Sequence, residues 1–375
     1  MELGVRGIAV RILIVVGLVV ALIAPGAAVE SVAADRRADL PSWRLTPTAT
    51  TNTLIALDVV DRKVVWAAGG GFGGATNDGS VVRTVDGGRS WQNVTPPGGA
   101  VDSFRDVEAF DRDHALVLAL PIGGEPSRIY RTADGGATWQ LVFRNTLPDA
   151  FYDCMAFFDD RHGLAVSDPV GGKYRILATE DGGRIWRQTP SGGMPAATPG
   201  DSALATGTCM VANGRRNAWF GTTGTSDGSS HNPQVFHTRD GGKTWSAADT
   251  PIPGETASIA SLSFRDPRHG LAVGGGFNPG EGIDSGVAAS TADGGSSWSI
   301  GDPLSGFRNS VAWVPGGGHT AVAVGPSGSD VSTDSGKSWT QFDRTHFLGV
   351  NCSSSGGCWA VGSGGMAAQL VVRRP

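Results

Sequence analysis

Hydrophobic and polar positions alternate in short runs along the chain, from about residue 40 to the C-terminal end. One such run covers residues 127–131, and a second, residues 139–143, follows it after a glycine-rich segment. Apolar side chains at every second position fit a strand with one buried face, and a glycine-rich segment between two such runs is typical of a hairpin turn. The pattern therefore predicts an all-β chain of short antiparallel strands.

The turns share one motif, Ser/Thr-x-Asp-x-Gly-x-x-Trp, the Asp-box, which occurs six times. The Asp and Ser/Thr side chains can accept hydrogen bonds from N–H groups of the turn, glycine supplies the positive φ, and tryptophan covers the turn with a large apolar body. Because turn chemistry explains every member of the motif, we interpret its aspartates as structural and not catalytic. They are Asp86, Asp134, Asp181, Asp240, Asp293 and Asp334.

A second repeated signature, a polar turn followed by an apolar strand, occurs seven times, for example at residues 159–166 and 266–273. Seven copies and six boxes leave one repeat incomplete, and Trp43 matches the tryptophan that closes a box. Successive tryptophans lie roughly 40 to 60 residues apart, which suits a four-stranded blade. We therefore predict a seven-bladed β-propeller over residues 40–375, with its last blade closed by the N-terminal strand.

Composition and charge narrow the possible partners and locations. The 375 residues include 57 glycines, and the net charge of −5 comes with scattered Lys and Arg, so we expect no nucleic acid partner. Within residues 1–34, Arg6 and Arg11 precede an apolar run that is shorter than the ~20 residues needed to cross a bilayer. This pattern predicts a signal peptide, with an uncleaved anchor as the alternative. We thus expect an exported protein that is periplasmic, in the cell envelope or extracellular.

The four cysteines match no zinc signature, and the histidines that recur in the polar turns are explained by turn chemistry, so no metal is expected. Cys352 and Cys358 flank a predicted hairpin turn, which makes them a candidate disulfide. We interpret Cys154 and Cys209 as buried small apolar residues.

The boxes, the chain length and the Gly-Leu-Ala-Val segments at residues 163–166 and 270–273 resemble the Asp-box propellers of the photosystem II stability and assembly factor family. Residues 103–110, 128–132 and 153–157 resemble its non-photosynthetic bacterial branch, whose members often carry the label "oxidoreductase". The resemblance covers nearly the whole mature chain. It implies a scaffold or assembly role outside the cytosol, and it names no client.

Two enzymatic alternatives have weaker support in the sequence. Residues 69–74 match Gly-x-Gly-x-x-Gly, but a second strand and not a helix follows them, so we expect no dinucleotide and no other cofactor. Sialidase-like glycoside hydrolases also use Asp-boxes on a propeller. Here the Arg-Ile-Pro motif of that class is missing, and no Tyr/Glu pair is apparent among Tyr130, Tyr152 and Tyr174. The sequence therefore favours binding over catalysis.

Polar residues at the start of several innermost strands give the candidate binding site. In the other blades the matching positions are apolar, and charge at this level of a propeller should lie near the central funnel. The alternative is that Arg105 and Arg308 pair with Asp106 and Asp153 and seal the ring. If these residues form a binding site, a protein or a small ligand binds at the funnel face. We expect the chain to be a monomer. The candidate site residues are Arg105, Asp106, Tyr152, Asp153, Thr208, Arg308 and Asn309.

Overall fold

The computed structural model describes residues 40–71, 79–99, 102–121, 126–224, 231–253, 257–276, 285–355 and 357–372. Almost all of them belong to one compact unit, Pro41–Arg374. The predicted signal segment, residues 1–34, lies outside the described residues. Within the described part of the chain, no helix has the length and apolar character needed to span a membrane.

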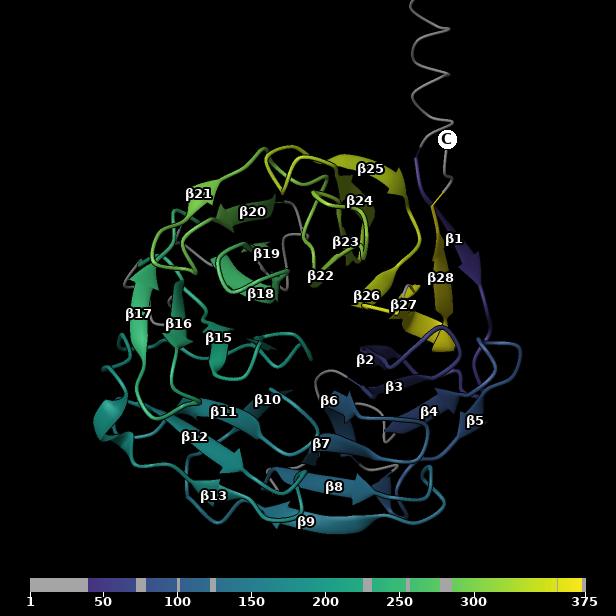
Figure 1. Cartoon of the computed structure of the whole chain (residues 1–375), viewed down its shortest axis with the longest axis horizontal. Helices are drawn as coiled ribbons and strands as arrows, with labels where there is room; N and C mark the ends of the chain where they lie inside the picture. The colour runs from purple at the N-terminus through teal and green to yellow at the C-terminus, as the bar shows by residue number, and fades with distance from the viewer. Residues whose placement is uncertain are drawn as a thin grey trace, which may run out of the picture. The chain divides into compact units, whose positions relative to one another are not determined.

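The described strands of this unit form seven four-stranded antiparallel sheets, which follow one another as the blades of a ring. In each of the first six blades the strands pair in chain order, and Figure 1 shows the first strand of most blades at the centre and the short fourth strand at the rim. Blades 1 to 4 consist of β2 (Leu54–Val59), β3 (Val65–Gly69), β4 (Ser80–Thr84), β5 (Gln92–Asn93); β6 (Asp102–Ala109), β7 (Ala115–Pro121), β8 (Arg128–Thr132), β9 (Gln140–Arg144); β10 (Tyr152–Phe157), β11 (Gly163–Pro169), β12 (Tyr174–Thr179), β13 (Arg187–Gln188); and β14 (Met210–Asn213), β15 (Asn217–Gly221), β16 (Gln234–Thr238), β17 (Ser246–Asp249).

The remaining blades repeat this order until the last one. Blades 5 to 7 consist of β18 (Ala257–Phe264), β19 (Gly270–Gly276), β20 (Ser285–Thr291), β21 (Ser299–Ile300); β22 (Ser310–Trp313), β23 (Ala321–Gly325), β24 (Gly328–Ser332), β25 (Thr340–Asp343); and β26 (Phe347–Ser353), β27 (Gly357–Gly362), β28 (Ala367–Val371) with the N-terminal β1 (Ser42–Leu45). The fold predicted from the repeats is thereby confirmed.

The N-terminal strand completes blade 7, as the unmatched Trp43 predicted. β1 pairs with β28 in antiparallel register, with Trp43 opposite Leu370. The Trp43 indole N–H donates to the Ser329 hydroxyl of blade 6 at 3.0 Å. Its ring lies 5.3 Å from that of Phe347, measured between centroids. The first strand therefore joins the last two blades and leaves no open edge at the seam.

The Asp-box turns join the third and fourth strands of blades 1 to 6. In the first box the Thr84 hydroxyl donates to Asp86 at 2.9 Å and accepts from the Gly88 N–H at 2.9 Å. The Asp86 carboxylate also accepts from the Ser90 hydroxyl at 2.7 Å, and this bond is the main reason why the pKa of Asp86 is lowered to about 2. The hydroxyl-to-carboxylate bond recurs in the other five boxes. All six aspartates therefore accept hydrogen bonds within their own turns.

The apolar core lies between neighbouring blades. Trp219 of blade 4 stacks on Phe264 of blade 5 with ring centroids 3.8 Å apart, and Trp298 packs edge-on against the same Phe264. All three side chains belong to one buried cluster. Burial of one large apolar side chain contributes about 1.5 to 3 kcal/mol, so each blade is stabilised chiefly by its neighbours.

Candidate functional site

The two faces of the ring carry different turns and connections. The innermost strands all run in the same direction, so they start at one face and end at the other. The Asp-box turns and the turns between first and second strands lie at the face where these strands end, which we call the box face. The connections between blades arrive at the opposite face, which we call the funnel face.

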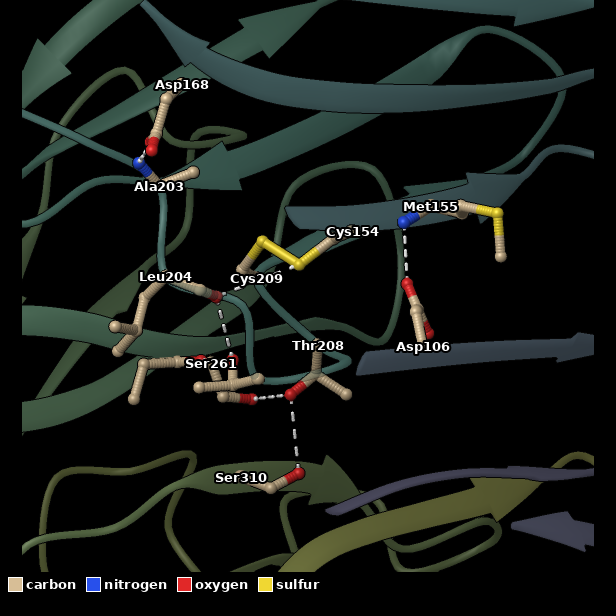
Figure 2. Close-up of a disulfide and its surroundings, with 12 residues drawn as sticks. Asp106, Cys154, Met155, Asp168, Ala203, Leu204, Thr208, Cys209, Ser261 and Ser310 are labelled. Carbon is tan, nitrogen blue, oxygen red and sulfur yellow. Dashed lines mark hydrogen bonds between the residues drawn. A yellow bond between two sulfur atoms is a disulfide. The ribbon is translucent and has the colours of Figure 1, made fainter. Parts of the chain in front are cut away.

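Part of the connection between β13 and β14, residues 202–208, runs across the inner end of the channel, and we call it the channel segment. The Ala203 N–H donates to the Asp168 carboxylate of blade 3 at 2.9 Å. The Thr206 hydroxyl donates to the Ala260 carbonyl of blade 5. The Thr208 hydroxyl donates to Ser261 of the same blade at 2.9 Å (Figure 2). The segment leads into blade 4, so these bonds tie it to the blades on both sides.

The backbone of the channel segment also reaches the far side of the ring. Gly207 has a φ of +78°, and a Cβ there would lie 2.7 Å from the Ala56 Cβ of blade 1 and 3.0 Å from the Arg105 carbonyl oxygen of blade 2. The Thr208 hydroxyl lies 3.4 Å from the Ser310 hydroxyl of blade 6. A segment that contacts blades 1, 2, 3, 5 and 6 must cross the centre of the ring.

A disulfide ties the end of the channel segment to blade 3. Cys209, directly after Thr208, is bonded to Cys154 of β10, and both cysteines are fully buried (Figure 2). The interpretation of these two cysteines as unbonded apolar residues is therefore wrong, although their burial was expected. They are 55 residues apart and in different blades, so only the adjacency of two innermost strands brings their Cα atoms within 6.1 Å.

The second pair of cysteines lies in a hairpin. Cys352 and Cys358 face each other across β26 and β27, with Cα atoms 4.0 Å apart, and their sulfurs are bonded. The sequence indicated this pair because its members flank a local turn.

The predicted site residues of blades 2 and 3 lie in the wall of the channel. Burial lowers the pKa of Arg105 to about 10, and the nearby Asp153 carboxylate opposes this shift. The Asp106 carboxylate accepts from the N–H groups of Val107 at 2.8 Å and Met155 at 2.6 Å, so it links the two blades. Tyr152 is also buried, which raises its pKa to about 12.

Arg308 lies in blade 6 and has different partners. Its guanidinium contacts the Asp330 carboxylate at 2.7 Å and donates to the Ser327 hydroxyl at 2.7 Å, with no exposed side-chain surface. The alternative that paired Arg308 with Asp106 or Asp153 is wrong, because the partner stands on the third strand of its own blade. The half-buried Asn309 donates its backbone N–H to the Val324 carbonyl.

The structure therefore brings the predicted residues together in separate groups. Arg105, Asp106 and Asp153 belong to the wall between blades 2 and 3, while Arg308 belongs to a buried ion pair of blade 6. Thr208 lies between these groups, on the channel segment. Whether any of them contacts a ligand stays a prediction.

Buried acidic groups that the sequence did not indicate flank the channel segment. Asp201 accepts from the Ser202 N–H and from the Thr223 hydroxyl, both at 3.1 Å. Burial raises the pKa of Asp168 to about 6, and Asp201 adds to this shift. Burial, and then the charge of Asp168, raises the pKa of Asp153 well above its ordinary value. Asp201 lies in the long connection between β13 and β14, where a sequence pattern carries no information about packing, and Asp168 lies near the end of β11.

The channel opens at the box face as a cavity of about 700 Å³. The innermost strands of blades 4 to 7 line it, with apolar walls that include Val211, Val311 and Val350, and Thr208 lies at its inner end. Among the described lining residues there is no Asp, Glu, Tyr or His. The cavity therefore offers apolar surface together with hydroxyl, amide and guanidinium groups, and the described part of its lining has no carboxyl, phenol or imidazole group for acid–base catalysis.

An aromatic and a cationic side chain stand at the rim of this cavity. The Arg265 guanidinium lies 4.9 Å from the centre of the Trp313 ring and donates to the Gly318 carbonyl at 2.8 Å. The Trp313 indole donates to the Ser263 carbonyl at 3.1 Å. Sequence reasoning missed this cavity. The only signal was a tryptophan on an innermost strand outside any Asp-box.

The fold and the repeat define the class of the protein, a seven-bladed Asp-box propeller. A model of the BNR/Asp-box repeat matches residues 236–247, which include the box of Asp240. Sequence comparison gives no match to a curated protein.

Solved structures share the fold at low sequence identity. YCF48 from Cyanidioschyzon merolae has a TM-score of 0.62 at 17% identity, covering 88% of this chain and 98% of that chain. YCF48 bound to D1 peptide has a TM-score of 0.59 at 17% identity, covering 89% and 96%. The GH74 xyloglucanase from Xanthomonas campestris has a TM-score of 0.61 at 14% identity, covering 88% of this chain and 53% of that chain.

These likenesses establish a propeller fold related to those of YCF48 and of a glycoside hydrolase. YCF48 is a photosystem II assembly factor, so the resemblance seen in the sequence is confirmed at the level of the repeat and the fold. Because one fold can carry many functions, these likenesses do not define an activity for this chain.

Proposed function

We propose that this chain is a non-catalytic binding propeller that holds a segment of a partner protein in its central channel. The observation that carries the proposal is the cavity of about 700 Å³ at the box face. Pockets of about 300 to 1,000 Å³ with apolar walls and a few polar groups are the usual size for specific ligands. The Trp313 and Arg265 side chains at the rim are of the types that dominate the energetics of protein interfaces.

A related fold supplies a precedent for the kind of partner. YCF48 has been solved bound to D1 peptide, so a propeller of this architecture can bind a peptide. For the present chain we infer a corresponding role as a binding or assembly scaffold. The predicted signal in residues 1–34 supports placing that role outside the cytosol, in the envelope or the medium.

We place the contact at the box face and not at the funnel face. Most predicted funnel residues are buried in the channel wall, where Arg308 has no exposed surface and Asp153 has 1%. Only Thr208 among them lines the cavity. A ligand at the box face can reach apolar surface without disrupting the buried ion pair of blade 6.

Glycoside hydrolysis is the alternative that the fold alone would permit. Most such enzymes need two carboxyl groups about 5 to 10 Å apart on either side of the bond that breaks. The described residues of the cavity lining include no carboxyl group at all. Turnover of a fluorogenic sialoside or xyloglucan oligosaccharide by the purified protein would contradict the proposal.

Selection of a phage-displayed peptide library on the purified chain tests peptide binding directly. The variant Asn351→Trp places a large ring in the cavity from a half-buried position on β26. We expect selected peptides to lose at least about tenfold in affinity, since the ring occupies their site. Gln140→Trp on the exposed edge strand of blade 2 is the matched control. Peptides that bind both variants as they bind the wild type would place the site elsewhere.

The expected location needs its own test. Residues 1–40 fused to a reporter enzyme that is active only after export should give activity, and substitution of Arg6 and Arg11 by Glu should abolish it. A fusion that stays inactive inside the cell would contradict export.

A further inference from the structure

We propose that the Cys154–Cys209 disulfide builds the floor of the central cavity, so that the chain can bind its partner only after these two thiols have been oxidised. This inference rests on the proposed function, because it concerns how the same cavity is formed. It adds a condition that neither the repeat nor the fold requires.

Thr208 is the residue that forms the inner end of the cavity. Its carbonyl accepts from the Leu262 N–H of blade 5 at 3.0 Å, and its hydroxyl donates to Ser261 at 2.9 Å. Ser261 in turn accepts from the Val311 N–H of blade 6 at 3.1 Å. The floor is therefore a hydrogen-bonded plate that couples blades 4, 5 and 6, as the dashed lines between Thr208, Ser261 and Ser310 show in part (Figure 2).

Thr208, which holds this plate together, lies at the end of the long connection between β13 and β14, outside any sheet. Hydrogen bonds between neutral groups hold it, and each of these contributes little to stability because water replaces it on opening. The disulfide is different, because it fixes Cys209, the next residue after Thr208, to the innermost strand of blade 3. The bonds of Thr208 described above all reach blades 5 and 6. The Ala203–Asp168 hydrogen bond also ties the segment to blade 3, but it lies five residues before Thr208, so the disulfide supplies the covalent tie to blade 3 next to Thr208.

Gly207 shows why the position of the segment must be held closely. Its backbone is left-handed, with a φ of +78°, and lies against Ala56 with no space for a Cβ. A shift of the segment toward blade 1 is blocked by this contact, and a shift away from it would lengthen the bonds of Thr208. The disulfide removes the remaining freedom at the C-terminal end of the segment.

The covalent step is an ordinary thiol–disulfide exchange. The two cysteine thiols lose two protons and two electrons and form one S–S bond, while the disulfide of a thiol–disulfide oxidoreductase accepts them and becomes two thiols. Both sulfurs are fully buried in the finished ring, so the exchange has to precede the final packing of blades 3 and 4. We therefore assign the bond to maturation in an oxidising compartment and not to a reversible switch.

The double variant Cys154→Ala/Cys209→Ala tests the inference in the full chain. We expect the Leu262 N–H, which donates to Thr208, and the Ala203 N–H to exchange with deuterium at least about tenfold faster than in the wild type, because the segment opens locally. Amides in the central strands of blades 1 and 7 should be unchanged. The control Cys352→Ala/Cys358→Ala removes the disulfide of the β26–β27 hairpin and should leave both amides as slow as before.

Affinity for a peptide selected on the wild-type chain gives the second readout. The Cys154→Ala/Cys209→Ala variant should bind that peptide at least about tenfold more weakly, because the floor is no longer held in place. Unchanged affinity would overturn the inference, even if exchange at Leu262 were faster. If the wild-type chain selects no peptide, the proposed function fails, whereas exchange at Leu262 still shows whether the disulfide holds the segment.

A second pair of substitutions covers the case in which the alanine variant does not fold. Cys154→Val/Cys209→Ala restores apolar volume in place of the two sulfurs. If this pair also fails to fold while the control variant folds, the bond is required for the ring itself and the inference is wrong.

Discussion

The buried Arg308–Asp330 pair gives the sharpest test of whether the charged residues near the funnel face are structural or bind a ligand. Both side chains are at most 1% exposed, and their charged atoms are 2.7 Å apart. Arg308→Met removes the guanidinium and leaves the Asp330 carboxylate buried, with the Ser305 hydroxyl and N–H as the remaining partners of its side chain among the described residues. Breaking a buried pair in this way costs about 3 to 5 kcal/mol, so we expect the free energy of unfolding to fall by that amount.

The double variant Arg308→Met/Asp330→Leu separates the cost of an orphaned charge from the value of the pair. With neither charge present, we expect stability within about 2 kcal/mol of the wild type, since an apolar replacement of similar volume avoids the desolvation of both groups. The two single variants should therefore be strongly non-additive.

Urea unfolding followed by tryptophan fluorescence measures these differences, and peptide affinity is measured on the same samples. Arg344→Met, at an exposed position of the same face, is the matched control and should change stability by less than about 0.5 kcal/mol. If Arg308→Met costs less than about 1 kcal/mol yet abolishes peptide binding, the structural interpretation of Arg308 is refuted and its predicted role in binding is supported.

Three further predictions rest on single residues. Burial raises the pKa of Asp58 to about 6, so the protonated carboxyl stabilises the folded chain below about pH 4, and this contribution is lost as the pH rises to about 6. The free energy of unfolding of Asp58→Asn minus that of the wild type should therefore increase by up to about 3 kcal/mol between pH 4 and pH 8. An equal difference in the free energy of unfolding at both pH values in urea titrations would contradict this. Trp43→Ala should lower the free energy of unfolding by about 2 kcal/mol, because the contacts that close the ring are lost. Leu45→Ala, at a side chain 56% exposed on the same strand, should lower it by less than about 0.5 kcal/mol. Equal melting temperatures for the two variants would refute a closing role for Trp43. Gly207→Ala should lower the free energy of unfolding by about 1 to 3 kcal/mol more than Gly364→Ala, because both have positive φ but only Gly207 lacks space for a Cβ; equal costs in chemical denaturation would show that the segment is not packed across the channel.

The fold could be predicted from the sequence because its determinants are local and repeated. Each Asp-box encodes its own hairpin through contacts within five residues, as between Thr84 and Gly88. The closure could also be predicted, since Trp43 had no box of its own and the C-terminal repeat lacked a fourth strand. Repetition amplified signals that a single copy would have left ambiguous.

The site could be predicted only in part, because its determinants are not local. The sequence placed Arg105 and Asp153 near the channel, but it could not show that Arg308 faces Asp330 on an outer strand. The bond between Cys154 and Cys209 joins two blades across 55 residues. The cavity arises from the ends of four innermost strands, and no pattern along one strand describes a space between four of them.

The pairing of β1 with β28 also sets an order of events during biosynthesis. Arg44 and Gln369, which face each other in this pair, are 325 residues apart. Closing a loop of that length costs about 5 kcal/mol of chain entropy, and almost the whole chain must be synthesised before the first strand meets its partner. Until then β1 has no sheet to join, and blade 7 presents an unpaired edge at which a second copy could exchange strands. A chain permuted to start at β26 would place the two strands side by side in the sequence and make the slowest contact of the ring a local one.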